Sequence, residues 1–524
     1  MTSQPLFNLL DEPWIPVRTH TGEVSEVSLT DALLKSNDYA SLAETSPPNL
    51  IALYRLLLAA LHRALTTQHG KWNDTDRARW FRDGLPEAPI RAYLAEWRER
   101  FWLFHPCEPF MQVAALAEAD KTRDKLKPWS QIALELSGGD TPLVFDHSLD
   151  SAPQPSEYSR VLRSLIGYLQ FTPGGLVKTF KTADFAGPLA STAAVMPVGA
   201  SLSETLLLSL HPWSREAIDD LPSWEVLPVT LGRIMSPPSL PSGHNDRYTR
   251  LTRSVLFTLE DRPYLVRFIR FSEGCGIQDD YRDPMVSSRV KDGEAQRISF
   301  TEGRGIWRDL PTLVPDTTRT YDIQAPSLGW AINLFLCLGD YSGNLSIVAA
   351  GWKNAPNKAA KLVRWRLDRI ELPPDLLLHA DSAQFLRITI RDAEGLYFRL
   401  REVYVELVAQ TMRDSKHKDT KARAKGIIAN GPAAAVFFSA AERAVPRLMQ
   451  QIAAGDTDMA DHAWKAALVK AAKQSWTATR RSLGDSPTVL RADARTWPQF
   501  CGLLKALLPP SVQSIATRPD EAPT

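Results

Sequence analysis

The C-terminal part of the chain carries a heptad pattern of core positions. Two rows of apolar or small side chains recur every seven residues: Leu386, Ala393, Leu400 and Leu407 in one row, and Thr389, Leu396 and Val403 in the other. Such a repeat predicts a long helix that packs against neighbouring helices. Further helical patterns cover residues 433–453, 458–483 and 491–508, so we predict a C-terminal four-helix bundle over residues 381–515.

Residues 1–375 have no single period and mix short strands, helices and long loops. A leucine stripe follows two prolines at 47 and 48, which predicts a helix with Asn49 as its N-cap. Alternating apolar runs within residues 255–271 predict a hairpin, and residues 236–249 have the composition of a loop. We therefore expect an α+β fold, in which a large mixed N-terminal domain with irregular loops spans residues 1–375 and a boundary at 372–383 precedes the bundle.

Composition is typical of a soluble globular protein, and the net charge is close to zero. The 524 residues include 44% hydrophobic and 23% charged side chains, with a formal net charge of +1. A uniformly basic coat for nucleic acid is therefore excluded. Basic side chains nevertheless outnumber acidic ones in residues 353–369, 411–430 and 462–484. Such segments can bind a phosphate backbone, and solvated helix faces are the equally weighted alternative.

Cysteines and apolar runs indicate a cytoplasmic protein with no membrane segment. The four cysteines lie far apart without a CxxC spacing, which argues against a zinc ribbon and suits a reducing compartment. The N-terminus shows no signal segment, and the longest apolar runs are too short to span a bilayer. We expect no cofactor, no bound metal and no membrane partner.

The motifs of common enzymes are absent from the sequence. It contains no P-loop, no GxSxG, no HExxH and no GxGxxG that follows a strand. One alternative is a metal-dependent nuclease that uses Asp279, Asp280 and Asp283, because carboxylates hold divalent ions. A polar loop after the hairpin explains these residues more simply, and a non-catalytic protein is expected.

Two segments have the chemistry of loops that read a nucleic-acid backbone. Gly174 and Gly175 form a tip without bulky side chains, and Lys178 and Lys181 follow it. Glycines let the main chain approach a ligand closely, and lysines supply charge for phosphates. Residues 351–358 (GWKNAPNK) place amide side chains on a rigid turn, which suits base edges or the wedging of a duplex. A plain turn is the alternative in both places.

Several short motifs occur in a fixed order along most of the chain. They are residues 8–17 (NLLDEPWIPV), 105–112 (HPCEPFMQ), 143–148 (LVFDHS), 187–190 (GPLA), 204–208 (ETLLL), 283–285 (DPM) and 307–308 (WR). In this order and spacing they resemble the large subunit (CasA family) of the type I-E CRISPR Cascade surveillance complex. The chain length and the mixed domain followed by a helical bundle agree with this family.

The resemblance implies a non-catalytic subunit whose partners are the other Cascade subunits and the crRNA 5′ handle. Such a subunit reads the protospacer-adjacent motif (PAM) in double-stranded target DNA, promotes duplex opening and provides a platform for a helicase-nuclease effector. Guide pairing then reads the sequence, while the protein reads the short motif and the backbone. A purely structural RNA–protein scaffold is the remaining alternative.

Three sets of positions are expected to form the interface. By the resemblance, the crRNA handle or a neighbouring subunit contacts Phe145, Asp146 and His147. PAM and DNA binding is expected from four features: the segment around Gly174 and Gly175 (the glycine loop), the wedge at residues 351–358, the basic segment beside the wedge and a minor-groove cation. Their residues are Gly174, Gly175, Lys178, Lys181, Arg270, Lys353, Asn354, Asn357, Lys358 and Lys361. The glutamine of the family's wedge is absent, which leaves Asn357 or Pro356 at its tip. Charge indicates that the displaced strand follows Lys465, Lys470, Lys473, Arg480 and Arg481.

Overall fold

The chain forms two compact units in the computed structural model, which describes residues 4–136, 152–175, 177–280, 282–316, 322–339, 343–355 and 358–507. The first unit comprises Met1–Phe300 and Thr320–Glu371, and the second comprises Thr301–Arg319 and Leu372–Thr524. Mixed helix and sheet confirm the α+β class. From the sequence we expected a single boundary between the two parts of the chain. The structure differs, because the short segment Thr301–Arg319 precedes that boundary and yet belongs to the helical unit.

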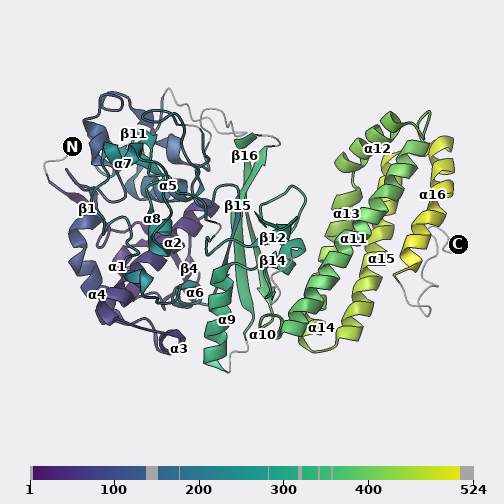
Figure 1. The fold of residues 1–524 in the computed structure, drawn as a ribbon, viewed down its shortest axis with the longest axis horizontal. Helices are drawn as coiled ribbons and strands as arrows, with labels where there is room; N and C mark the ends of the chain where they lie inside the picture. The colour runs from purple at the N-terminus through teal and green to yellow at the C-terminus, as the bar shows by residue number, and fades with distance from the viewer. Residues whose placement is uncertain are drawn as a thin grey trace. The chain divides into compact units, whose positions relative to one another are not determined.

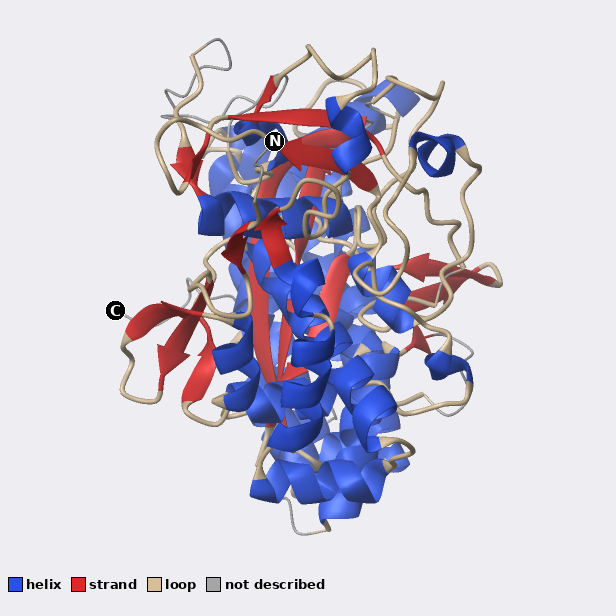
Figure 2. Ribbon diagram, turned by 90° about the vertical axis from the view of Figure 1, so that its left-hand side faces the viewer, coloured by secondary structure: helices blue, strands red, loops and turns tan. Residues whose placement is uncertain are grey.

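Small antiparallel sheets and helices make up the first unit. Its strands are β1 Leu6–Asn8, β2 Ile15–Thr19, β3 Val24–Val27, β4 Tyr39–Leu42, β5 Trp102–Phe104, β6 Lys127–Pro128, β7 Ser156–Glu157, β8 Ala193–Val198, β9 Arg253–Phe257, β10 Leu265–Val266, β11 Phe268–Glu273, β12 Ser288–Lys291, β13 Glu294–Arg297, β14 Asp322–Ile323, β15 Leu345–Ala355 and β16 Lys358–Leu372. Its α-helices are α1 Leu29–Leu34, α2 Pro47–Ala64, α3 Asp74–Asp83, α4 Glu87–Glu96, α5 Tyr158–Phe171, α6 Leu202–Ser209, α7 Leu231–Met235, α8 His244–Thr249 and α9 Pro326–Leu338. The sheets have the strand orders β1–β5, β10–β7, β6–β11–β9, β13–β12–β14, β16–β15–β8 and β3–β2–β4, and Figure 2 shows them as separate groups of strands.

Helix α2 is the core helix of the first unit. The predicted helix is confirmed, but it begins three residues earlier, with Ser46 as its N-cap and prolines at its first positions. Asn49 is therefore not the N-cap. It is buried in the first turn against Gly167 of α5, where an added Cβ would lie 2.1 Å from the Asn49 side-chain oxygen. The stretch Pro47–His69 is long and apolar enough to cross a membrane, yet 89% of its apolar window is buried inside the protein, as in a core helix.

Strands β9 and β11 confirm the predicted hairpin. They pair antiparallel from Ile269 opposite Phe257 to Glu273 opposite Arg253. The strand β10 between them in sequence pairs with β7 instead. This register places Arg253 and Glu273 opposite one another at the end of the hairpin, where both side chains contact the glycine loop.

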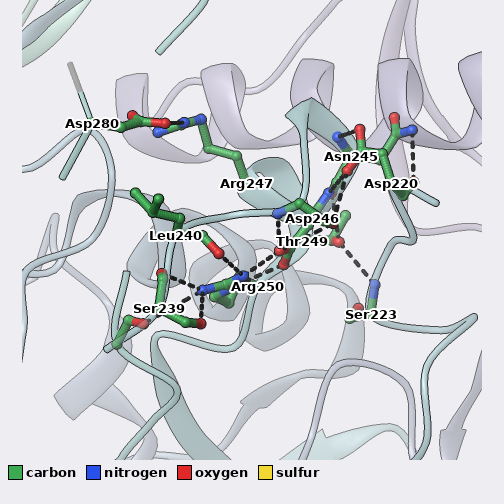
Figure 3. A network of polar contacts seen from close by, with 12 residues as sticks. Asp220, Ser223, Ser239, Leu240, Asn245, Asp246, Arg247, Thr249, Arg250 and Asp280 are labelled. Atoms are coloured by element: carbon green, nitrogen blue, oxygen red, sulfur yellow. Dashed lines mark hydrogen bonds and ion pairs between the residues drawn. The ribbon is translucent and has the colours of Figure 1, made fainter. Parts of the chain in front are cut away.

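Residues 236–249, predicted as a loop, contain the largely buried helix α8. The carboxylate of Asp220 accepts a hydrogen bond from the backbone N–H of Asn245 at 2.7 Å and so caps the helix start. Figure 3 shows this cap and, at the other end of α8, Arg250 bound to carbonyl oxygens of the preceding loop. The loop prediction holds for residues 236–243 and is wrong for residues 244–249, because Asp220 lies 25 residues before Asn245 in the helix it caps, outside any local pattern.

The second unit is helical. Its helices are α10 Asp375–Leu378, α11 Ala380–Gln410, α12 Lys418–Asn430, α13 Ala433–Glu442, α14 Val445–Ala453, α15 Thr457–Ser482 and α16 Pro487–Lys505. Figure 1 shows α11, α13, α15 and α16 lying lengthwise beside one another. Both rows of heptad positions on α11 are buried, which confirms the predicted core stripe. The single helix expected over 433–453 is two helices, because Pro446 starts α14 in its first turn.

The segment Thr301–Arg319 packs on α11 through a short 3₁₀ helix, Ile306–Thr312. Arg308 Nε donates to the carboxylate of Glu394 on α11 at 2.6 Å, and Arg304 reaches the same carboxylate at 2.8 Å. Trp307 lies between helices, with its ring 6.2 Å from that of Trp464. These contacts explain why this segment belongs to the helical unit.

Candidate nucleic-acid interface

The glycine loop begins where helix α5 ends at Phe171. Gly175 is exposed and has φ +83°, a left-handed conformation that glycine adopts without strain. The carboxylate of Asp184 accepts hydrogen bonds from the backbone N–H groups of Gly175 and Val177, the second at 3.2 Å. One buried carboxylate therefore holds both sides of the loop tip.

A buried ion pair fixes that carboxylate in place. Arg253 Nη2 lies 2.7 Å from Asp184 Oδ2, and both side chains are 1% exposed. The same guanidinium donates to the carbonyl oxygens of Pro173 at 2.6 Å and Phe185 at 2.7 Å. Arg253 thus connects the two ends of the loop through hydrogen bonds.

A second buried carboxylate holds the segment after the tip. Glu273 is fully buried, and its carboxylate accepts hydrogen bonds from the consecutive N–H groups of Thr179, Phe180 and Lys181, the last two at 3.0 Å. Three successive N–H groups around one carboxylate form an anion-binding nest. The protein therefore fills this nest with its own carboxylate.

The two lysines of the loop lie in different surroundings. Lys178 is exposed. Lys181 is half-buried, and its Nζ donates to the carbonyl oxygen of Ser236 at 2.9 Å. Lys178 is therefore the better placed of the two to meet a phosphate.

A strip of basic residues that we did not predict lies beside the glycine loop. Lys121 Nζ donates to the carbonyl oxygen of Thr179 at 2.9 Å, which connects the strip to the loop. Arg270 on β11 is half-buried, and its Nε donates to the carbonyl oxygen of Arg123 at 3.1 Å. The alternation of basic residues was the available sequence signal, and the four side chains are all exposed: Lys121, Arg123, Lys125 and Lys127.

The hairpin β15–β16 is anchored at the same place as the glycine loop. Trp352 is buried and stacks on Trp365 with ring centroids 5.4 Å apart. Trp365 meets Phe171 edge to face at 5.6 Å, and its Nε1 donates to the carbonyl oxygen of Leu134 at 3.0 Å. Phe171 is the last residue of α5, so the hairpin and the glycine loop share one support.

The expected turn at residues 351–355 is instead part of strand β15. Gly351 pairs with Ala193 of β8, and an added Cβ would lie 2.1 Å from the Thr192 carbonyl oxygen. This glycine therefore serves the close approach of two strands rather than a turn. The backbones of the four predicted residues Lys353, Asn354, Lys358 and Lys361 lie on β15 and β16.

Several predicted residues lie outside the described residues. They are the wedge candidates Pro356 and Asn357 and the handle-contacting residues Phe145, Asp146 and His147. Their roles stay predictions.

Helix α15 carries the five residues that we expect to follow the displaced strand, and it places them in two different surroundings. A shallow groove on one face of the helix is lined by Lys470, Lys473 and Arg481. Lys465 instead pairs with Asp461 at 2.6 Å, and Arg480 pairs with Asp485 at 2.9 Å. The structure therefore brings three of the five together along one groove, which the other two do not line.

Changing Lys470, Lys473 and Arg481 to glutamine is expected to weaken binding of single-stranded DNA by the assembled complex. Three fewer phosphate contacts lower the slope of log affinity against log salt by about 2. Titration of a labelled single strand at several salt concentrations measures this slope. The double change Lys465→Gln and Arg480→Gln on the same helix is the control, because these two cations do not line the groove. Equal slopes for the two variants would contradict the assignment.

The acidic loop considered for a nuclease is neutralised by arginines. Asp280 pairs with Arg247 at 2.6 Å, and Asp279 pairs with Arg297. Asp283 is buried against Arg55. Burial opposes ionisation of Asp283, but Arg55 and Arg247 outweigh it and hold the pKa of this carboxyl below its ordinary value. Across the described residues no group of three or more acidic, histidine or cysteine side chains forms a metal site, so the nuclease alternative gains no support.

A cavity of about 990 Å³ lies in the first unit beside α8. Several charged groups on its wall have partners within the protein. Arg250 is bound to Asp246 through its Nε at 2.8 Å, and Glu225 is bound to Arg63 at 2.5 Å. These paired groups are not arranged for acid–base chemistry on a bound molecule.

Comparison with known proteins identifies the family. The family model described as CRISPR-associated protein Cse1 matches residues 8–475. CasA/Cse1 of Thermus thermophilus is 33% identical over 518 residues, which cover 97% of this chain and 99% of the relative. The crystal structure of Thermus thermophilus CasA has a TM-score of 0.81 at 31% identity, covering 95% of this chain and 99% of that one. A chain of a solved CRISPR RNA-guided surveillance complex has the same fold, with a TM-score of 0.74 at 19% identity and coverage of 95% and 100%.

These matches place the chain among the CRISPR-associated proteins. It belongs to the Cse1 family, also called CasA, the large subunit of the type I-E Cascade complex. This confirms the resemblance seen in the ordered motifs. The family is a non-catalytic subunit of Cascade.

Proposed function

We propose that this chain recognises the PAM in double-stranded DNA, promotes duplex opening for crRNA pairing and recruits the helicase-nuclease. The observation that carries the proposal is the common support of the glycine loop and the hairpin at Phe171. A glycine tip held by Asp184 and Glu273 suits close approach of the main chain to a minor groove. The long hairpin beside it suits insertion between base pairs.

The proposed reading of the PAM is permissive. A minor groove distinguishes A·T from G·C pairs but little more. The exposed cations beside the loop, Lys178 and Lys121, suit phosphate contacts, which position a protein without reading sequence. We therefore expect discrimination of PAM classes rather than of one sequence.

The contacts with the crRNA 5′ handle and with the helicase-nuclease rest on family membership. The handle contact is proposed for Phe145, Asp146 and His147, because an aromatic side chain stacks on an unpaired nucleotide. The platform for the effector is proposed for the subunit as a whole.

Binding of target duplexes by the Cascade complex with and without this subunit tests the proposal. We expect PAM-dependent binding only when the subunit is present. PAM-dependent binding that persists unchanged without it would overturn the proposal and favour a structural scaffold. Incubation of the lone protein with DNA and divalent ions tests the nuclease alternative, for which cleavage lost on Asp280→Asn would be the supporting result.

Substitution Gly175→Ala is expected to weaken PAM-dependent binding about tenfold. The left-handed conformation costs a residue with a Cβ roughly 1–2 kcal/mol, so the tip shifts to another conformation. Gly293→Ala is the matched control, since Gly293 has φ +82° and, like Gly175, has nothing within 4 Å of an added Cβ. Competition binding of duplexes that differ only in the PAM measures the effect. Equal PAM discrimination in the two variants would show that the tip conformation does not matter.

A further inference from the structure

Helix α12 and the turn before it carry a patch of basic side chains to which the proposed function assigns no role. The patch has six members, all exposed: Arg413, Lys416, Lys418, Lys421, Arg423 and Lys425. The acidic residues in this stretch are Asp414 and Asp419, also exposed. In the part of the chain that the structure describes, none of the six cations lies within ion-pair distance of a carboxylate.

Other cations of the same unit have acidic partners. Arg308 binds Glu394, Lys465 binds Asp461 and Arg480 binds Asp485. The α12 patch is thus a concentration of positive charge that the fold itself leaves unbalanced. Such a patch attracts an external polyanion.

The packing of α12 leaves most of its surface open. Within the helix, Ala424 and Ile428 are the buried residues, four positions apart on one narrow stripe. The lysines Lys418, Lys421 and Lys425 are spaced three and four apart, so they follow one another in a row along the helix. This row can contact a linear polyanion at several points at once.

The chemistry of the patch favours a phosphate backbone over a protein surface. Protein interfaces have apolar or aromatic cores and are depleted in lysine. The patch has four lysines among its six cations and no aromatic side chain. A lysine ammonium is a hydrated point charge that suits phosphate, whereas pairing with carboxylates favours the planar fork of arginine.

We infer that the α12 patch is a second nucleic-acid site, which binds the phosphate backbone without reading its sequence. It lies on the helical unit, on a different helix from the α15 groove and on a different unit from the glycine loop. Duplex DNA and a single strand share the phosphate chemistry, and the two are distinguished by the test. The inference does not depend on PAM reading.

The test compares lysine variants of the full-length chain in binding to PAM-free DNA. The variant K418Q/K421Q/K425Q removes three charges, and K35Q/K71Q/K291Q removes three exposed lysines of the first unit as a control. Affinities for a labelled duplex and for a single strand of equal length are measured across a range of salt concentrations. For the α12 variant we expect at least a tenfold loss at low salt and a slope lower by about 2–3, while the control matches the unchanged protein.

Further readouts separate a charge effect from a folding effect and from PAM reading. The variant K418R/K421R/K425R keeps the charge and is expected to keep both affinity and slope. The ratio of affinities with and without a PAM, measured in the assembled complex, is expected to be the same in all variants. The larger slope change identifies whether duplex or single strand is the natural ligand. DNA binding equal to the control would overturn the inference, as would a variant that loses only Cascade assembly, which would assign the patch to an acidic protein surface.

Discussion

Replacing Asp184 with alanine is expected to lower the free energy of unfolding by about 3–5 kcal/mol and to abolish PAM-dependent binding. The change leaves the guanidinium of Arg253 buried without its carboxylate, and an unpaired buried charge is strongly destabilising. It also removes the acceptor for the backbone N–H groups of Gly175 and Val177, so the loop tip loses its defined shape. Chemical denaturation and duplex binding by the assembled complex measure the two effects.

Two comparison variants separate lost stability from lost loop order. Glu225→Ala breaks another buried pair, that with Arg63, which does not contact the loop. It is expected to lose similar stability but to keep PAM discrimination wherever it is folded. The double change Asp184→Leu with Arg253→Met removes both charges, and apolar replacement of a buried pair recovers stability. It is expected to regain part of the stability without regaining PAM discrimination. If PAM discrimination returned with stability, the clamp would have no part in reading DNA.

The second large expected effect is a steep loss of stability below pH 6.5, caused by a cluster of three buried histidines in the first unit. The rings of His62 and His211 lie 3.5 Å apart, and His244 meets His211 edge to face at 5.0 Å. Burial, together with His244 and Arg63, lowers the pKa of His62 to about 3. Burial, with Arg247 as the next cause, lowers the pKa of His244 to about 4.

The third ring of this cluster is affected in the same direction. Burial, with the neighbouring histidines and Arg77, lowers the pKa of His211 well below its ordinary value. In the described part of the chain neither ring nitrogen of His211 has a hydrogen-bond partner. All three histidines are therefore neutral in the folded protein at neutral pH.

The sign of the pH dependence follows from these lowered pKa values. The unfolded chain binds protons on histidine as the pH falls through about 6.5, whereas the folded protein does not until about pH 4 or below. Stability is fully present above pH 6.5 and falls between pH 6.5 and 4 by about 1.4 kcal/mol per pH unit for each histidine. Unfolding free energies measured by denaturant titration from pH 8 to 4.5 test this expectation.

Substitution of one ring reduces the pH dependence by about a third. His211→Phe is the suitable change, because it keeps an aromatic ring in the stack and removes two buried nitrogens that lack partners. His462→Gln, at an exposed position on α15, is the control and is expected to leave the pH profile unchanged. An unchanged profile in the His211 variant would show that the cluster does not control acid stability.

Local patterns in the sequence were sufficient for the long helix α11 of the helical unit and for the family. The heptad rows of α11 predicted its buried stripe, because a helix places residues seven apart on one face. The same local reasoning failed for α8, since its cap Asp220 is distant in sequence. It also wrongly predicted a turn at residues 351–355. The reason is that Gly351 is required by its pairing with β8, a strand that is distant in sequence.

The candidate interface was only partly predictable, for a related reason. Composition singled out Gly174, Gly175 and Lys178, because glycine and lysine have recognisable chemistry wherever they occur. No local pattern singled out Glu273. Its carboxylate accepts a hydrogen bond from the backbone N–H of Thr179, which lies 94 residues away in sequence. The basic strip around Lys121 had a sequence signal in its alternating basic residues, but its two nearby aspartates reduce its local charge.

Helix periodicity, the family motifs and the residue types that can contact phosphate could all be deduced from the sequence. Those features depend on residues that are close together in sequence, so they can be recognised without a structure. Which charges remain available to a partner depends on the folded arrangement. It pairs Asp184 with Arg253 and Lys465 with Asp461, whereas the row of lysines on α12 has no ion-pair partner among the residues that the structure describes. The physical reason is that an ion pair depends on distance in space, and folding brings together groups whose separation in sequence gives no sign of it.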